Sequence, residues 1–147
     1  MTATDDLLRL ENQLCFAIVT AARNVVAVYR PILEPLGLTH PQYLVMLALW
    51  ERAPRTLHDL AADLALEPAT ASPLVKRLEA DGLVTRQRST RDERRLEITL
   101  TDAGAALRER AVDVPRQVMA AVEMDPAQIA LLRDGLGAFA GRRPRAD

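Results

Sequence analysis

Cys15, in the stretch LENQLCF, is the only cysteine of this chain and the side chain with the most reactive chemistry. A cysteine thiolate attacks peroxides, whereas the protonated thiol does not. A single cysteine cannot form a disulfide within its own chain, and no Cys-x-x-Cys pair or metal-ligand cluster surrounds it. Cys15 is therefore either an inert packing residue or a redox-active thiol, and the rest of the sequence must decide between the two.

The neighbours of Cys15 along the chain do not supply a positive charge. Residues 5 to about 34 carry apolar side chains at spacings of three and four, which predicts one long helix. Within it Cys15 lies about ten residues from the start, with Glu11 one turn before it and Val19 one turn after it. Any group that stabilises a thiolate at Cys15 must therefore come from outside this helix.

The predicted helix has an apolar surface that is too wide for one core-facing side. Two adjacent stripes run along it, made of Leu7, Leu10, Leu14, Ile18, Ala21, Val25, Val28 and Ile32, and of Leu8, Glu11, Cys15, Val19, Ala22, Val26 and Tyr29. One interpretation is a fully buried central helix. The other is a helix that packs on its own core and also on a partner subunit.

Length and composition restrict the class of protein. With 147 residues, rich in alanine, leucine and arginine, the chain is expected to form one mainly helical domain. It has no unbroken run of 18 apolar residues and no basic and apolar leader at its start. We therefore expect a cytoplasmic protein with no membrane partner.

The net charge of −1 hides a basic segment. Between residues 76 and 95 seven cations face four acids, a net of +3, which leaves −4 for the remainder. The cations are Lys76, Arg77, Arg86, Arg88, Arg91, Arg94 and Arg95. A basic patch on an acidic body is typical of a protein that contacts phosphate on one side only.

Capping residues divide the middle of the chain into short helices. Thr39 with Gln42 fits a capping box for a helix that follows, and Thr56 opens a second, shorter one. Pro68 is a suitable first residue for a third helix, which ends at Gly82. Two short helices joined by a tight turn have the spacing of a helix-turn-helix.

After Gly82 the apolar period changes from helix to strand. Residues 83–88 and 94–100 alternate apolar and polar side chains around the charged segment STRDE, which predicts a β-hairpin. Thr101 then caps another helix, interrupted at Pro115, and a last helix covers residues 126–140.

The predicted fold class is therefore mainly α with a small β-hairpin wing. We expect a single chain, 1–147, with a winged helix-turn-helix at about residues 40–100. Helices at about 1–35 and 105–147 are expected to form a homodimer.

The predicted function of this fold is DNA binding. The second helix would enter the major groove, where hydroxyls bond to base edges and cations hold phosphates. The candidate contacts are Thr70, Ser72, Lys76, Arg77, Arg86 and Arg88. The alternative is a solvated hairpin in some other small helical protein.

Two stretches resemble the MarR family of bacterial regulators. The segment RDERRLEITLTDAG is similar to the wing signature of that family, and LVKRLEADGLVTRQRS is similar to its recognition helix and first wing strand. The resemblance implies that Arg94 enters the minor groove and that Asp92 shapes the wing. It covers nearly the whole chain.

A narrower resemblance concerns Cys15. The segments LENQLCFA and YRPILEPLGLTHPQYLVMLALWE resemble the OhrR branch, which represses organic-hydroperoxide defence. The resemblance implies that Cys15 senses peroxide and that tyrosine hydroxyls donate hydrogen bonds to its sulfur. Tyr29 matches one of these tyrosines, whereas Val19 and His40 stand at two positions that are often tyrosine in that branch.

Tyr29 cannot reach Cys15 along one straight helix. Fourteen residues correspond to about 21 Å of rise, although the two side chains share nearly the same helix face. An antiparallel crossing of this helix in a symmetric dimer would bring Cys15 to Tyr29 of the other chain. His40 would be a further hydrogen-bond donor to the sulfur, or else a residue of a solvent-facing helix cap.

Oxidation of Cys15 would first give a sulfenic acid. Because no second cysteine can resolve it, the chain resembles the one-cysteine type, in which a low-molecular-weight thiol caps the sulfur or overoxidation follows. The expected function is a repressor that binds a pseudo-palindromic operator in double-stranded DNA and is released by an organic hydroperoxide.

Three alternatives remain. A repressor of the same fold could bind a small phenolic or carboxylate ligand, with Cys15 a structural residue. A thiol peroxidase is disfavoured because no resolving cysteine or acid–base cluster accompanies Cys15, and His40 and His58 are the only histidines. A purely structural dimerisation module leaves the wing unexplained. We expect no enzyme activity, no cofactor and no metal site.

Overall fold

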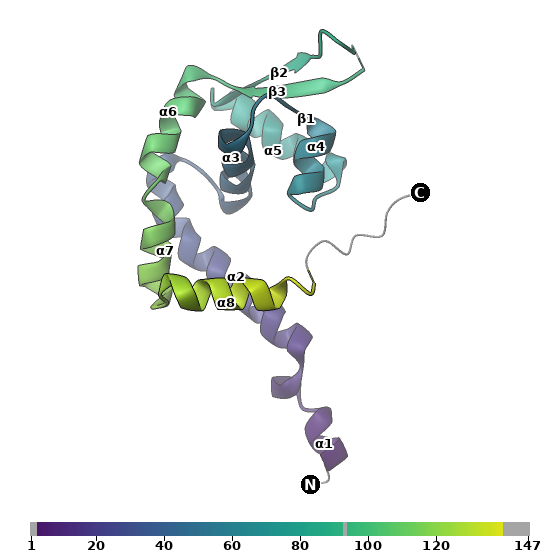
Figure 1. The fold of residues 1–147 in the computed structure, drawn as a ribbon, viewed down its shortest axis with the longest axis vertical. Helices are drawn as coiled ribbons and strands as arrows, with labels where there is room; N and C mark the ends of the chain where they lie inside the picture. The colour runs from purple at the N-terminus through teal and green to yellow at the C-terminus, as the bar shows by residue number, and fades with distance from the viewer. Residues whose placement is uncertain (1–2, 93, 140–147) are drawn as a thin grey trace.

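The computed structural model describes residues 3–92 and 94–139. Figure 1 shows a lobe of short helices with a small sheet, and further helices that extend away from it. The lobe consists of α3 (His40–Glu51), β1 (Arg55–Thr56), α4 (Leu57–Asp63), α5 (Pro68–Ala80), β2 (Val84–Arg88) and β3 (Leu96–Leu100). Its strands form one antiparallel sheet in the order β1-β3-β2. This arrangement is the winged helix-turn-helix that the sequence predicted.

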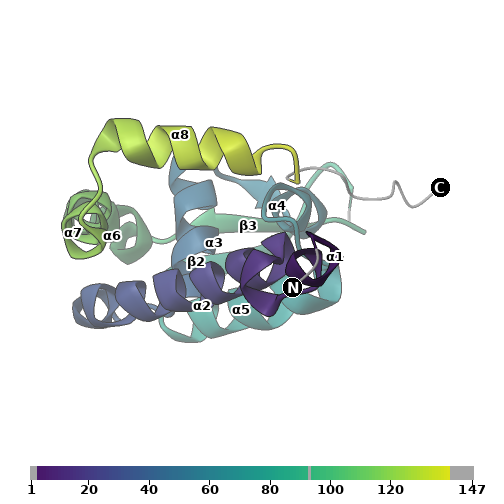
Figure 2. The same cartoon turned by 90° about the horizontal axis from the view of Figure 1, so that it is seen from below.

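The helices outside the lobe come from both ends of the chain. They are α1 (Ala3–Leu7), α2 (Leu14–Leu33), α6 (Asp102–Ala111), α7 (Val114–Val122) and α8 (Pro126–Leu136), with the 3₁₀ turns η1 (Leu10–Asn12) and η2 (Glu34–Leu36). α2 packs along α7, whereas Figure 2 shows α8 lying apart from α2 on the other side of the molecule. The predicted last residue of the final helix, Ala140, and the outermost parts of the two predicted dimerisation regions, 1–2 and 140–147, lie outside the described residues.

One continuous apolar core holds the lobe and joins it to α2 and α7. Each lobe helix contributes buried side chains to this core. The largest fully buried side chains include Leu33, Met46, Leu49, Leu60, Leu78, Ile98 and Val114. Because Leu33 ends α2 and Val114 begins α7, the two outer helices are anchored at the ends that face the lobe.

The predicted helix caps are confirmed. Thr39 and Gln42 form a capping box, with the Thr39 N–H donating to Gln42 Oε1 at 2.9 Å. The Thr56 hydroxyl accepts from the Asp59 N–H at 3.1 Å, and the Thr101 hydroxyl accepts from the Gly104 N–H at 3.0 Å. These bonds satisfy helix N–H groups that have no partner within the helix.

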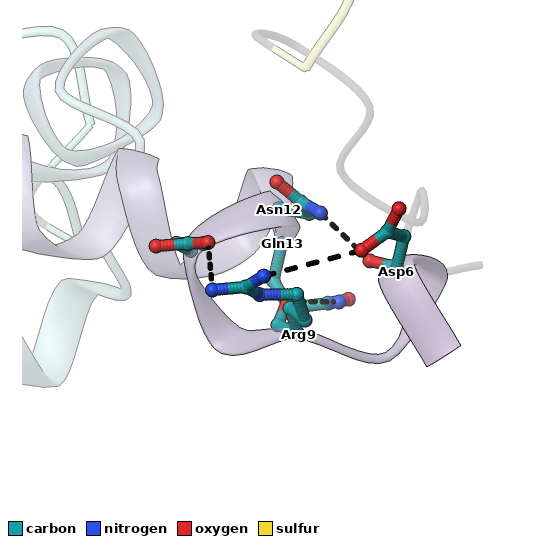
Figure 3. A network of polar contacts seen from close by, with 5 residues as sticks. Asp6, Arg9, Asn12 and Gln13 are labelled. Atoms are coloured by element: carbon teal, nitrogen blue, oxygen red, sulfur yellow. Dashed lines mark hydrogen bonds and ion pairs between the residues drawn. The ribbon is translucent and has the colours of Figure 1, made fainter. Parts of the chain in front are cut away.

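The prediction of one long helix over residues 5–34 is wrong. The chain leaves the helix after Leu7, and both Arg9 and Gln13 have extended backbone angles. Figure 3 shows the reason: side-chain amides take the carbonyl groups that a continuous helix would have used. Asn12 Nδ2 donates to the Asp6 carbonyl at 2.7 Å, and Gln13 Nε2 donates to the Leu7 and Arg9 carbonyls at 2.8 Å. Local side-chain bonds of this kind compete with helix formation.

Strand β1 was not predicted from the sequence. Its two residues pair with β3, Arg55 opposite Ile98 and Thr56 opposite Glu97. The Arg55 side chain is buried, forms an ion pair with Asp63 at the end of α4, and donates to the Ala48 carbonyl of α3 at 3.2 Å. A strand of two residues is too short to show an alternating pattern.

Of the two interpretations of the first long helix, the fully buried central helix is contradicted within this chain. Only Leu33 of α2 is buried, and apolar side chains are exposed along α1, α2 and α8. They include Leu7, Leu8, Leu10, Leu14, Phe16, Val19, Val25, Val26, Leu131, Leu132, Leu136 and Phe139. Exposed apolar side chains in this number are typical of helices that pack against a partner.

The stretch Leu14–Leu36 is also long and apolar enough to cross a membrane, judged by length and composition alone. Arg23 and Arg30 interrupt it, so it contains no unbroken apolar run of 18 residues. A helix whose faces are covered by protein has the same composition.

Candidate nucleic-acid interface and redox site

Helix α5 presents a polar face to solvent. Its apolar face, formed by Ala71, Val75 and Leu78, is fully buried in the lobe, which fixes the rotation of the helix. Of the residues predicted to contact DNA, Thr70, Lys76 and Arg77 are exposed and Ser72 is half-buried. Arg77 Nε lies 3.6 Å from Asp81 Oδ1, one turn along the helix.

Arg86 connects the wing to α5. Its side chain donates to Glu79 Oε1 from Nε at 3.0 Å and from Nη2 at 2.9 Å, while its backbone N–H donates to Glu79 Oε2 at 2.9 Å. The hydrogen bonds from the Arg86 side chain, then those from its backbone, hold the pKa of Glu79 below its usual range. Arg86 therefore holds strand β2 against α5 with its positive charge already paired.

Replacing Glu79 with glutamine is expected to loosen this attachment. A carboxylate with a lowered pKa stabilises the fold above its unfolded-state pKa, and this contribution is lost as the pH falls through the folded-state pKa. The wild type should therefore have a higher Tm than Glu79→Gln at pH 7, and the difference should shrink as the pH falls below 4.5, the ordinary pKa of a glutamate. Thermal unfolding of both proteins at a series of pH values on either side of 4.5 measures the effect. A constant Tm difference across the range would contradict it.

The wing turn is organised around Asp92. Its Oδ1 accepts from the Arg94 N–H at 3.1 Å, and its carbonyl accepts from the Arg95 N–H at 2.9 Å. The Ser89 N–H closes the base of the turn by donating to the Arg95 carbonyl at 2.8 Å. Arg88 and Arg94 are exposed on this hairpin.

Cys15 lies in the first turn of α2, which corrects its predicted position ten residues inside a helix. It is exposed, and the first main-chain bond of α2 runs from the Ala17 N–H to the Gln13 carbonyl at 3.2 Å. The Gln13 side chain caps no α2 N–H group, because it is bonded to the preceding turn. Cys15 is therefore the second residue of α2, at the end of the helix where main-chain N–H groups have no partner within the helix.

Two of the three predicted redox-site residues lie together. The ring centroids of Tyr29 and His40 are 4.9 Å apart in an edge arrangement. His40 is half-buried, so it is more than a solvent-facing residue of the helix cap. Cys15 is on the same helix as Tyr29 but about 21 Å along its axis, so one chain does not join the sulfur to this pair.

Tyr43 completes this cluster and was missed from the sequence. It is 3% exposed, and its ring centroid lies 5.8 Å from that of Tyr29. Its position one turn after His40 was the available signal. Burial raises the pKa of both tyrosines and lowers the pKa of His40, so the neutral side chains are favoured. Neutral phenols keep the proton that a hydrogen bond to sulfur requires.

A pocket of about 800 Å³ opens between α2, α3 and α5. Arg30, His40 and Arg77 supply its basic and aromatic lining, and Glu34 and Asp81 are acidic residues in the same wall. Among the residues that the structure describes, no group of three or more His, Cys, Asp or Glu side chains could hold a metal ion.

The comparisons with known proteins agree with this geometry. The MarR family model matches residues 38–96, from the start of α3 to the wing. The organic hydroperoxide resistance transcriptional regulator of Bacillus subtilis strain 168 is 40% identical over 131 residues, 89% of each chain. The DNA-bound structure of overoxidised AbfR, a protein of Staphylococcus epidermidis, has a TM-score of 0.75 and 35% identity, and covers 92% of this chain and 96% of that one.

A ligand-bound structure is also similar. CouR from Rhodococcus jostii RHA1, bound to p-coumaroyl-CoA, has a TM-score of 0.74 and 26% identity over 93% of this chain and 98% of that chain. Because the MarR family model matches residues 38–96 and the Bacillus subtilis regulator is 40% identical over 89% of the chain, the chain belongs to the MarR family of transcriptional regulators. It is similar to the organic-hydroperoxide branch of that family.

Proposed function

We propose that this protein is a homodimeric repressor that binds a pseudo-palindromic operator and is released when an organic hydroperoxide oxidises Cys15. The observation that carries the proposal is the exposed Cys15 sulfur in the uncapped first turn of α2. In this position the sulfur is accessible to an oxidant, which a sensor requires. The likeness to a regulator of organic hydroperoxide resistance supports the same chemistry.

The dimer is proposed to complete the sensor. Exposed apolar residues line α2 on both sides of Cys15, which supports burial of this helix against a second copy. An antiparallel crossing of the two α2 helices would bring the sulfur of one chain to Tyr29 and His40 of the other. The protonated Tyr29 phenol would then donate a hydrogen bond to the sulfur. Val19 has no hydroxyl, so this position adds no donor.

The redox chemistry of Cys15 proceeds in two balanced steps. The thiolate attacks the distal oxygen of ROOH, the O–O bond breaks, and protonation gives Cys–SOH and ROH. A low-molecular-weight thiol R′SH then attacks the sulfenic sulfur, which gives the mixed disulfide Cys–S–SR′ and water. Without a second cysteine the thiol must come from solution. A thiol reductant and repeated peroxide turnover would be needed for an enzyme, whereas one oxidation is enough for a sensor.

The adduct would act on DNA binding through the dimer. A bulky group in a packed α2 interface forces the helices apart, because packed interiors do not absorb extra volume. The two α5 helices must reach half-sites about one helical turn apart, so a change of a few ångströms loses one half-site. In this proposal Thr70, Ser72, Lys76, Arg77, Arg88 and Arg94 contact DNA, Asp92 shapes the wing, and Arg86 positions it. Such a regulator would act in the cytoplasm.

The experiment that tests the proposal is a DNA-binding titration of the wild type with and without cumene hydroperoxide. The operator is first selected from a library of random duplexes. Reduced protein should bind the selected duplex as a dimer and lose affinity after oxidation, and a thiol reductant should restore binding to the capped form. Equal affinity before and after oxidation would refute the redox mechanism.

A second candidate function is release by a small phenolic or carboxylate ligand. The observation in its favour is the pocket between α2, α3 and α5, in which Arg30 could pair with a carboxylate and which joins a candidate dimer helix to the recognition helix. The likeness to CouR bound to p-coumaroyl-CoA supports it. Adding 4-hydroxybenzoate to the complex in place of peroxide separates the two functions, since this ligand cannot oxidise Cys15.

A further inference from the structure

A basic crevice lies between the wing and the helix-turn-helix. It has a volume of about 380 Å³ and runs from the first turn of α4 and Pro68, the first residue of α5, to the start of β3. His58, Arg94 and Arg95 are exposed along its walls, with Asp59 as the acidic residue among them. Neither His58 nor Arg95 belongs to the DNA contacts proposed above.

The position of the crevice follows from the two elements that border it. If α5 enters a major groove and the wing tip enters the adjacent minor groove, one sugar–phosphate strand must pass between them, because that strand is the wall that the two grooves share. The crevice is lined by the first residue of α5 on one side and by wing residues on the other. It therefore lies where that strand crosses the protein.

The side chains in the crevice fit a phosphodiester. Arg95 Nε lies 3.7 Å from Asp92 Oδ2. The Arg95 side chain is 68% exposed, so its other N–H groups can donate to a second acceptor. An imidazole N–H of His58 can donate to a phosphate oxygen in either charge state. Asp59 is the acidic residue among those that line the crevice, and its carboxylate repels phosphate.

We propose that this crevice binds the DNA backbone between the two grooves, with Arg95 and His58 as phosphate contacts and Asp59 as a group that weakens binding. The inference rests on the DNA-binding function proposed above. Phosphate contacts set affinity and register but carry no base information. Each copy of the crevice in the dimer should therefore contribute the same binding free energy on the operator and on unrelated DNA.

The test measures the affinity of the full-length dimer for two duplexes of about 30 base pairs, the selected operator and one of mixed sequence, across a range of salt concentrations. Arg95→Ala should weaken both complexes by about tenfold at low salt. Each arginine on a phosphate contributes about 0.9 to the slope of log K against log salt, so two lost contacts per dimer should reduce the slope by about 1.8.

Matched variants separate contact from folding. Arg95→Lys should keep the salt slope, and His58→Gln should keep the affinity that His58→Ala loses, because each retains a donor. Arg116→Ala removes an arginine on α7, a helix that Figure 1 shows well away from α4 and the wing, and should change neither quantity. Asp59→Asn should bind both duplexes several-fold more tightly, a gain that a loss of stability cannot produce.

An unchanged salt slope for Arg95→Ala, a loss on the operator alone, or no gain for Asp59→Asn would each overturn the crevice as a phosphate site. Failure of the wild type to bind either duplex would instead overturn the proposed function. The two failures are distinguishable because the wild-type titration precedes the variants.

Discussion

Dimers carrying Cys15→Ser are expected to bind the operator like the wild type and to stay bound after hydroperoxide treatment. A serine hydroxyl in the same first turn of α2 is not a nucleophile at neutral pH and cannot form a sulfenic acid. The wild type should lose at least about tenfold in affinity on oxidation, equivalent to about 1.4 kcal/mol. Fluorescence anisotropy of labelled operator, before and after cumene hydroperoxide and a small thiol, measures both proteins.

Tyr29→Phe is the matched control for this experiment. It removes one hydroxyl and keeps the ring that packs against His40 and Tyr43. If the partner's phenol stabilises the sulfur, this variant in its reduced state should bind the operator normally, but its Cys15 should be oxidised more slowly. Release of Cys15→Ser by peroxide would remove the thiol from the mechanism. Release of both wild type and Cys15→Ser by 4-hydroxybenzoate would instead support the ligand-binding alternative.

Arg94→Ala should weaken operator binding by about 100-fold while leaving the fold intact. Each arginine lost from a groove costs about 1–3 kcal/mol, and a dimer loses two. The Arg94 side chain is exposed, and its hydrogen bond to Asp92 is made by the backbone N–H, which alanine retains. The wing turn should therefore survive the substitution.

Parallel measurements of operator affinity and of Tm test this expectation. The free energy of unfolding should change by less than about 0.5 kcal/mol, as is usual for an exposed side chain without a specific role. Arg94→Lys keeps the charge but not the planar guanidinium, so an intermediate affinity is expected. Wild-type affinity in Arg94→Ala would show that the wing tip does not enter the minor groove.

The local parts of the fold could be read from the sequence because their causes are local. Thr39, Thr56 and Thr101 each cap a helix through a bond to a residue three positions later, so the pattern is visible in four letters. The alternation around residues 84–100 likewise reflects a hairpin whose strands are neighbours in the chain. The residue types of the candidate DNA contacts followed from the same local reading and from the family resemblance.

The position of Cys15 within its helix depends on side-chain hydrogen bonds that compete with the helix, and the apolar periodicity does not show these bonds. The apolar stripe of residues 5–34 continues through the break, but the Asn12 and Gln13 amides take carbonyls up to six residues back and end the first helix. Cys15 thereby moves from the interior of a helix to its first turn. Hydropathy cannot show this, because polar side chains that bond to the main chain resemble polar side chains that face water.

Sequence alone determined the capped helices, the hairpin, the basic segment and the single thiol, all of which arise from residue type and short spacing. Tertiary structure alone decided that Arg86 is paired with Glu79, that Tyr43 joins Tyr29 and His40, and that Arg55 in β1 joins the sheet to α3 and α4. These contacts join side chains from different elements, and folding selects them by packing and desolvation, which depend on where distant segments meet in space.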